Sequence, residues 1–252
     1  MKKILKVATY NIAHGLNYNG KAYSQNMPVD LSNTANAIKE VDADIVGLNE
    51  VYDSGIEELV NQAKKLAQYA GFSDYVFGQS ILINLQGVLS AYGNAFLSKY
   101  KIIKSEVIKV PSPKLGERGC NGYYEDRSVL HVVIDCGVNV SVYVTHFGLN
   151  DDEKQPMVKT LINLIDNDSL PVILMGDFNA EPNDEILKPI YDRLTSCAKE
   201  VGNTQFTYST CKPEITIDYV FVSKYFKIKE FEVVNTLVSD HFPCKAVLQL
   251  EI

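Results

Sequence analysis

The chain has 252 residues, of which 46% are hydrophobic and 22% charged, which is ordinary globular composition and argues against extensive disorder. This length suits one α/β domain that spans residues 1–252. The net charge of −7 and the pI near 5.2 argue against tight nonspecific binding to nucleic acid, because such a surface repels a polyanion on average.

The amino terminus and the cysteines indicate the compartment. The opening MKKILKVATYN turns polar too soon to form the apolar core of a signal peptide. No run of the chain approaches the roughly 18 apolar residues of a membrane-spanning helix. The five cysteines are widely spaced without a CxxC pair, which favours neither a disulfide framework nor a zinc site. We therefore expect a cytoplasmic protein with reduced thiols and no stable membrane insertion.

The first half of the chain alternates between strands and amphipathic helices. Strands are predicted at residues 4–9 and 44–51, with a helix beginning at Asp30 or Ser32 between them. A second helix is predicted from residue 56 to residue 70, where apolar positions recur at helical spacing and Gly71 supplies the stop. Short strands are predicted near residues 74–79, 94–98 and 101–110.

The second half is richer in strands. Residues 127–135 and 139–145 are predicted to form a hairpin around Gly137, and a helix at 152–166 precedes an apolar strand at 171–175. Strands at 216–222, 226–234 and 245–252 complete the pattern. About three or four helices are too few for a (βα)8 barrel, which needs eight crossovers. The sequence therefore predicts a strand-rich α/β (α+β) fold in which helices cover mixed sheets.

Polar side chains suited to metal and phosphate chemistry follow or interrupt several apolar strands. A single aspartate in such a place is most often a helix cap or turn former. As a set, carboxylates and amides at strand ends can converge at one sheet edge, where their oxygens suit Mg2+ or Mn2+. Histidine adds proton transfer near neutral pH. The set comprises Asn11, Glu50, His146, Asp177, Asn179, Asp218, Asp240 and His241.

Arg127 opens the apolar run RSVLHVVID after a glycine-containing loop. Its guanidinium is suited to binding a phosphate oxygen, although position alone favours a structural salt bridge almost equally. The chain contains no GxxxxGK[ST] loop, no GxSxG turn and no HExxH helix. P-loop nucleotide hydrolases, serine hydrolases of that type and zincins therefore lack their usual signals.

The motifs TYNI, GLNEV, GNAFLS, RSVL, THFGL, GDFNAEP, IDYVFVS and SDHFPCKAVL occur in this order over nearly the whole chain. The series resembles the endonuclease/exonuclease/phosphatase superfamily, the group of DNase I and the exonuclease III-like enzymes. The resemblance implies a DNase I-like four-layered sandwich. In this fold two mixed β-sheets pack face to face with helices outside, and the active site lies at one edge of the sheets.

The resemblance also implies a division of labour among the candidate residues. Glu50 corresponds to the principal ligand of Mg2+ (or Mn2+), and Asn11 and Asp240 line the metal region. Asp177, supported by Asn179, is expected to orient and deprotonate the attacking water. Many members have Gln before the metal-binding Glu, whereas this chain has the shorter amide of Asn49.

The remaining roles concern the phosphate. The Asp218–His241 pair is expected to fix an imidazole beside the scissile phosphate. His146 is expected to donate a hydrogen bond or proton near the phosphate or leaving oxygen. Arg127 is expected to stabilise the charge of the transition state.

For the substrate, we expect a small soluble or lipid-derived phosphoester, cleaved by a phosphodiesterase or phosphatase. A nuclease of the exonuclease III type is the alternative, ranked second because the chain has no tryptophan and a negative net charge. A noncatalytic binding module on the same fold is a remote alternative, because the catalytic set is complete. The loop at residues 115–126 is expected to overhang the site. Tyrosines that could stack on a substrate are Tyr18, Tyr23, Tyr92, Tyr123 and Tyr124.

Overall fold

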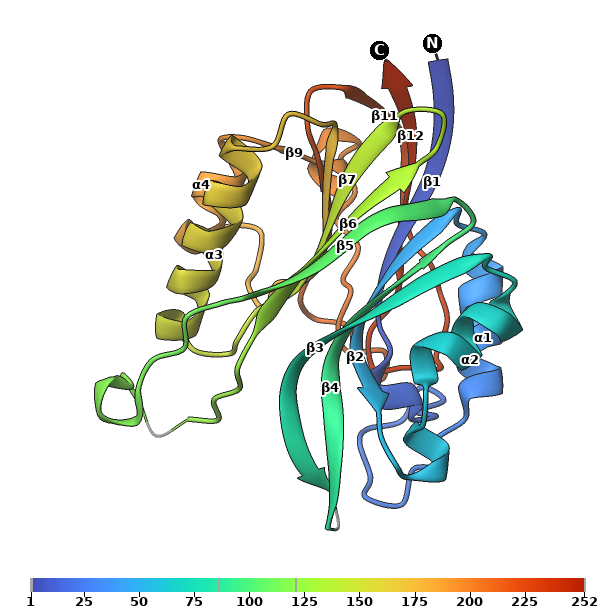
Figure 1. The fold of residues 1–252 in the computed structure, drawn as a ribbon, viewed down its shortest axis with the longest axis vertical. Helices are drawn as coiled ribbons and strands as arrows, with labels where there is room; N and C mark the ends of the chain where they lie inside the picture. Colours follow the sequence, from blue (N-terminus) through green and yellow to red (C-terminus); the bar gives the residue numbers. More distant parts are fainter. Residues whose placement is uncertain (1, 86, 121, 252) are drawn as a thin grey trace.

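The computed structural model of the protein describes residues 2–85, 87–120 and 122–251. Two mixed β-sheets of six strands each form its centre (Figure 1). The first sheet has the order β11-β12-β1-β2-β4-β3, built from β1 (Lys2–Asn11), β2 (Ile45–Asp53), β3 (Asp74–Leu85), β4 (Val88–Ser98), β11 (Phe226–Val233) and β12 (Cys244–Glu251). The second sheet has the order β5-β6-β7-β8-β10-β9, built from β5 (Lys101–Lys109), β6 (Ser128–Asp135), β7 (Asn139–His146), β8 (Val172–Asp177), β9 (Thr195–Ser196) and β10 (Asp218–Val222).

Helices cover the outer faces of both sheets. Helices α1 (Leu31–Val41) and α2 (Gln62–Ala70) cover the first sheet, whereas α3 (Asp151–Asp166) and the short α4 (Lys188–Tyr191) cover the second (Figure 1). The one-turn helix α5 (Cys197–Glu200) lies beside β10 and β11. The predicted four-layered sandwich is therefore confirmed. Within the described residues, no helix is both long enough and apolar enough to cross a membrane.

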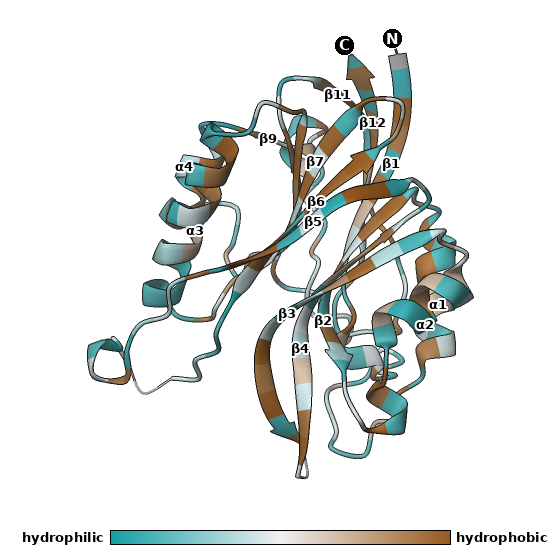
Figure 2. Ribbon diagram, viewed as in Figure 1, coloured by the Kyte–Doolittle hydropathy of each residue, from teal (hydrophilic) through white to brown (hydrophobic). Residues whose placement is uncertain are grey.

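The core between the two sheets is made by the inward faces of their strands. Brown, apolar stretches follow the central strands, whereas teal residues predominate on the outer turns of the helices (Figure 2). Val7 and Ile45 of the first sheet and Val142 of the second are fully buried in this core. At Gly47 the sheets approach closely, because an added Cβ would lie only 2.7 Å from Sδ of Met175. Burial of these apolar faces supplies the main driving force for joining the sheets.

Each sheet contains one parallel strand pair joined by a crossover helix. In the first sheet β1 pairs with β2 across α1, and Asn11 lies opposite Asn49. In the second sheet β7 pairs with β8 across α3, and His146 lies opposite Asp177. The carboxyl ends of two parallel strands lie at the same sheet edge. Polar residues that are far apart in sequence are thereby brought to one end of the molecule, opposite the chain termini (Figure 1).

Several predicted elements are confirmed in place. Asp30 caps α1 by accepting a hydrogen bond from the backbone N–H of Asn33 at 2.9 Å. β6 and β7 form the predicted antiparallel hairpin, and Gly137 at its turn has φ 93°. Such a positive φ costs glycine little and other residues more.

Other predicted boundaries were wrong. The helix predicted from residue 56 begins only at Gln62, because Asn61 adopts a left-handed φ of 48° that a right-handed helix does not continue. The strands predicted at 74–79 and 94–98 are the outer parts of one longer hairpin, β3–β4, which also contains the unpredicted residues 80–85 and 88–93. The strand predicted from residue 216 begins at Asp218, and Ile252 of the last predicted strand lies outside the described residues.

Gly176 gives a prediction about stability. It has φ 145°, and an added Cβ would lie 1.8 Å from the backbone oxygen of Thr145 on the neighbouring strand. We expect Gly176→Ala to lower the free energy of unfolding by about 3 kcal/mol or more, because backbone atoms cannot move aside cheaply. Urea unfolding followed by circular dichroism measures this. The control is Gly116→Ala, where no atom lies within 4 Å of the added Cβ. Equal unfolding midpoints for the two variants would contradict the prediction.

Candidate active site

A cavity of about 570 Å³ opens at the sheet edge where the parallel pairs end. Seven of the nine predicted site residues line it, contributed by both sheets and by the loops that follow their strands. The other two, Asn11 and Asp218, are buried behind the wall and hydrogen-bond to lining residues. The predicted set therefore forms one cluster. The lining members are Glu50, Arg127, His146, Asp177, Asn179, Asp240 and His241.

Asp177, the last residue of β8, lies at the centre of the cluster. Its Oδ2 accepts a hydrogen bond from Nδ2 of Asn11 at 3.1 Å, and its Oδ1 accepts one from the backbone N–H of Asn179 at 2.9 Å. Nε2 of His146 and Nε2 of His241 lie 3.6 Å and 3.7 Å from the same Oδ2. Burial raises the pKa of Asp177 to about 7, although the charge of His241 opposes the rise. A carboxyl group with this pKa can exchange protons near neutral pH.

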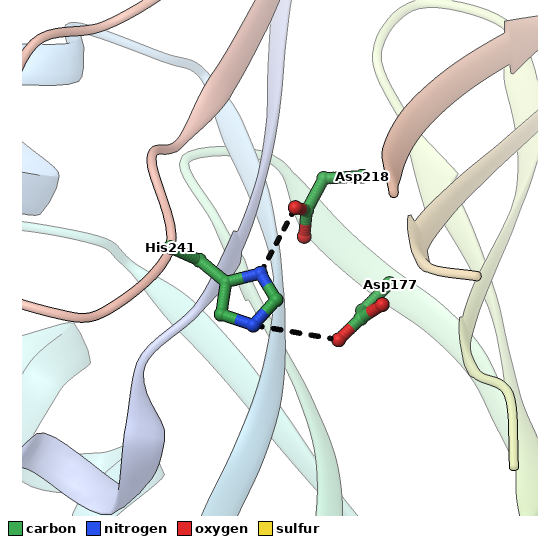
Figure 3. Close-up of side chains that lie close together, drawn as sticks. All are labelled: Asp177, Asp218 and His241. Atoms are coloured by element: carbon green, nitrogen blue, oxygen red, sulfur yellow. Dashed lines mark hydrogen bonds and ion pairs between the residues drawn. The ribbon is translucent and has the colours of Figure 1, made fainter. Parts of the chain in front are cut away.

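His241 lies between two buried carboxylates (Figure 3). Its Nδ1 is 2.9 Å from Oδ2 of Asp218, and its Nε2 faces Asp177. Burial by itself lowers the pKa of His241, but Asp218 and Asp177 together raise it to about 10. The ring is therefore an imidazolium at neutral pH and donates from both nitrogens. It places a positive charge beside Asp177 inside the cavity.

The pKa of His146 is shifted in the opposite direction from that of His241. Burial lowers its pKa well below the usual range, and the positive charge of Arg127 lowers it further. Its Nδ1 lies 3.0 Å from Nη1 of Arg127. Because a guanidinium only donates hydrogen bonds, Nδ1 must accept, and the proton of the neutral ring is on Nε2. His146 therefore presents an N–H group toward Asp177 and the cavity.

The oxygen-rich part of the cavity is formed by Glu50 and Asp240, with Asn11 buried behind them. Glu50 has φ 58° and lies in an irregularity of the β2–β4 ladder, the kind of feature that redirects a side chain. Its Oε1 accepts a hydrogen bond from Nδ2 of Asn11 at 3.1 Å. Burial raises the pKa of Asp240, and the charge of Glu50 adds to this rise although His241 opposes it. Two carboxylates that line the same cavity, together with an amide, suit a hard divalent cation.

A second group with metal-ligand spacing is formed by Asp177, Asp218 and His241, whose candidate atoms lie within 4.8 Å of one another. Both nitrogens of His241 carry protons at neutral pH, since its pKa is raised to about 10. A protonated nitrogen has no lone pair for a metal. The donor chemistry therefore favours the Glu50 region for a cation and leaves this group for proton transfer.

Asn49, the shorter amide noted in the sequence, connects the two sheets behind the site. Its Nδ2 donates to Oδ1 of Asn94 at 2.8 Å and to the backbone oxygen of Thr145 at 2.9 Å. Its Oδ1 accepts from the backbone N–H of Asp177 at 3.0 Å. The side chain is fully buried, so these bonds are not exchanged with water. Asn49 thus spans the gap and holds the end of β8 in place.

The sequence did not single out some residues that line the cavity. His14 lies in the loop after β1 with Nδ1 3.3 Å from Oε2 of Glu50, and its ring contacts Tyr92 edge-on. Glu125 and Tyr208 also line the cavity. They come from irregular loops, where no periodicity or strand-end position marks a residue.

Two of the five candidate tyrosines line the cavity and three do not. Tyr92 and Tyr123 line the cavity, and Tyr123 belongs to the loop at 115–126, which therefore borders the site. Tyr18 is buried and Tyr23 is 64% exposed, and neither lines the cavity. Tyr124 donates to Oδ2 of Asp152 at 2.9 Å, away from the cavity wall.

Residues 8–241 match the model of the Endonuclease/Exonuclease/phosphatase family. The chain belongs to the endonuclease/exonuclease/phosphatase family. This confirms the predicted superfamily and, with it, the prediction of a phosphoric ester hydrolase. No curated protein sequence matches the chain.

Several solved structures share the fold of this chain. The endonuclease/exonuclease/phosphatase of Beutenbergia cavernae DSM 12333 is 23% identical with a TM-score of 0.78, over 99% of this chain and 72% of that one. The mannosyl-6-phosphatase of Bacteroides thetaiotaomicron VPI-5482 is 20% identical with a TM-score of 0.71, over 97% and 99% of the two chains. ANGEL2, a 2',3'-cyclic phosphatase, is 17% identical with a TM-score of 0.73, over 100% and 96%.

Proposed function

We propose that the protein is a divalent-metal-dependent hydrolase of a small soluble or lipid-derived phosphoester. The observation that carries this proposal is Asp177, a buried carboxyl group with a pKa of about 7, flanked by an imidazolium and a neutral imidazole in one cavity. Mg2+ or Mn2+, held by Glu50, Asn11 and Asp240, would polarise a phosphoryl oxygen as a Lewis acid. The remaining steps belong to side chains of the protein.

Asp177 and Asn179 act on the attacking water. Nδ2 of Asn179 donates to the backbone oxygen of Phe147 at 3.0 Å, which fixes the amide and leaves its Oδ1 as an acceptor. That oxygen orients the water while Asp177 takes its proton. His241, held by Asp218, keeps the Asp177 carboxylate in position and balances its charge.

His146 and Arg127 act on the phosphate. The Nε2–H of His146 donates a hydrogen bond to a phosphoryl or leaving oxygen, a role that its lowered pKa favours over proton transfer. Arg127 lines the cavity, where its positive charge would stabilise the negative charge that develops on the phosphate.

The cavity favours a small substrate over a polymer. Its volume of about 570 Å³ suits a small molecule. Among the described residues that line it, Arg127 is the only lysine or arginine, and six others are acidic. A cavity wall with this charge does not attract the phosphate backbone of a nucleic acid. The mannosyl-6-phosphatase of Bacteroides thetaiotaomicron offers a sugar monoester as the first substrate to test.

The test compares p-nitrophenyl phosphate, bis-p-nitrophenyl phosphate, mannose 6-phosphate and an abasic-site DNA duplex. Protein treated with EDTA is assayed before and after Mg2+ or Mn2+ is restored. We expect metal-dependent hydrolysis of at least one small ester, and more of it than of DNA. Preference for DNA would support the nuclease alternative instead. Metal-independent turnover, or none on any substrate, would contradict the proposal.

Glu50→Gln gives a specific prediction for the metal. The substitution removes a charge from the oxygen-rich region while keeping the side-chain length, so we expect the Mg2+ concentration for half-maximal activity to rise about tenfold or more. Calorimetric titration with Mg2+ checks the binding change without turnover. The control is Glu57→Gln, an exposed residue outside the cavity. An unchanged Mg2+ requirement would remove Glu50 from the metal region.

A further inference from the structure

Glu125 is a buried carboxylate that the mechanism above does not use. It lies in the loop before β6, and its side chain is only 9% exposed. Its Oε2 accepts from Nη2 of Arg127 at 3.0 Å, and its Oε1 accepts from the hydroxyl of Tyr123. Its backbone N–H donates to Oε1 of Glu153, near the start of α3, at 3.2 Å. The carboxylate thus has two partners, and the backbone of Glu125 has a third.

Arg127 is fixed between this carboxylate and His146. Nη2 points to Glu125, and Nη1 lies 3.0 Å from Nδ1 of His146. The planar guanidinium presents these two donors in a rigid fork, so anchoring one nitrogen fixes the direction of the other. The orientation of the His146 imidazole therefore depends on Glu125, which holds the other terminal nitrogen of the guanidinium.

The tautomer of His146 depends on the same contact. Nδ1 accepts only while Arg127 donates to it, and this acceptance leaves the proton on Nε2. If Glu125 were absent, the guanidinium would lose its only charged partner at Nη2 among the described residues. The guanidinium could then turn away from His146, which would lose the donor that selects its tautomer.

We infer that Glu125 is a positioning residue, which acts through Arg127 to hold His146 with its Nε2–H directed at the substrate phosphate. The inference rests on the proposed function, because it assigns a task to the same cavity. It goes beyond that function because it gives Glu125, a residue of the loop at 115–126, a task in the reaction through its contact with Arg127.

A double-mutant cycle tests the inference. Glu125→Ala is expected to lower kcat about 10- to 100-fold with little change in KM, the usual range for a residue that orients another. In a His146→Ala background the same substitution is expected to have almost no further effect, because the group it acts through is gone. Glu125→Gln retains an acceptor and is expected to restore most of the activity. Equal losses in both backgrounds would indicate a structural role and overturn the inference.

A second measurement does not depend on turnover. Protein labelled with ¹⁵N-histidine reports the tautomer of each ring by NMR, and His146→Ala assigns the signals of His146. We expect the Nε2–H form in the wild type and a shift toward mixed tautomers in Glu125→Ala. Glu117→Ala, an exposed residue of the same loop, is the matched control and should leave the signals unchanged. An unchanged His146 signal in Glu125→Ala would overturn the inference. A shifted signal in a protein without metal-dependent activity would contradict only the proposed function.

Discussion

Asp177→Asn is expected to lower kcat by about three to four orders of magnitude, with a much smaller change in KM. The asparagine fills the same volume and can still accept the hydrogen bond that the backbone of Asn179 donates at 2.9 Å. It cannot take a proton from water, and it gives the imidazolium of His241 no negative partner on the cavity side. The loss therefore falls on the chemical step and not on substrate binding.

The measurement is kcat and KM for the best small ester at saturating Mg2+, with the melting temperature recorded alongside. Asp192→Asn is the control, because Asp192 is an exposed aspartate outside the cavity. We expect the melting temperature of Asp177→Asn to fall only modestly, because Oδ2 of Asp177 lies 3.7 Å from Nε2 of His241, beyond hydrogen-bond distance. A fall in kcat of less than about tenfold would show that Asp177 is not the base.

Most of the architecture was predictable because motif and strand position agree. Asn11, His146 and Asp177 each end a strand of a parallel pair, and the topology places all such ends at one edge. Residue type then narrows the chemistry, since amide, imidazole and carboxylate groups at one edge suit a phosphoester and a hard cation. Asp177 and Asn179 of GDFNAEP and Asp240 and His241 of SDHFP therefore lie together at the cavity, as the sequence indicates.

The parts that were not predictable depend on conformations without a local signal. Glu50 reaches the cavity through φ 58° in an irregular stretch of β2, which no periodicity reveals. Glu125 lies in a loop whose course is set by contacts with the start of α3, more than 25 residues further along the chain. The full length of the β3–β4 hairpin was missed because its distal residues pair only with each other, and apolar side chains such as Leu82 and Leu89 are exposed there.

Asp218→Asn is expected to affect both activity and stability. Asp218 is almost fully buried and its Oδ2 lies 2.9 Å from Nδ1 of His241, so the substitution removes one partner of a buried ion pair. Removal of one such partner typically costs about 3–5 kcal/mol, because the other charge is left without compensation. Without the charge of Asp218, burial lowers the pKa of His241 and only Asp177 and Asp240 still raise it. His241 is then less often protonated, so Asp177 loses the positive charge beside it. We expect kcat to fall by about 10²–10³-fold.

Urea unfolding and steady-state kinetics on the same preparation separate this result from that of Asp177→Asn. Both aspartates flank His241, but Oδ2 of Asp218 lies 2.9 Å from its Nδ1 whereas Oδ2 of Asp177 lies 3.7 Å from its Nε2. The Asp177 variant should therefore lose more activity and less stability than the Asp218 variant. Ser141→Ala is the matched control, because its hydroxyl lies 3.2 Å from Nε2 of His131, a histidine outside the cavity. This control should cost about 1 kcal/mol of stability and no activity. An Asp218→Asn variant with wild-type kcat would show that the charge of His241 does not assist the reaction, and Asp177 would then work without it.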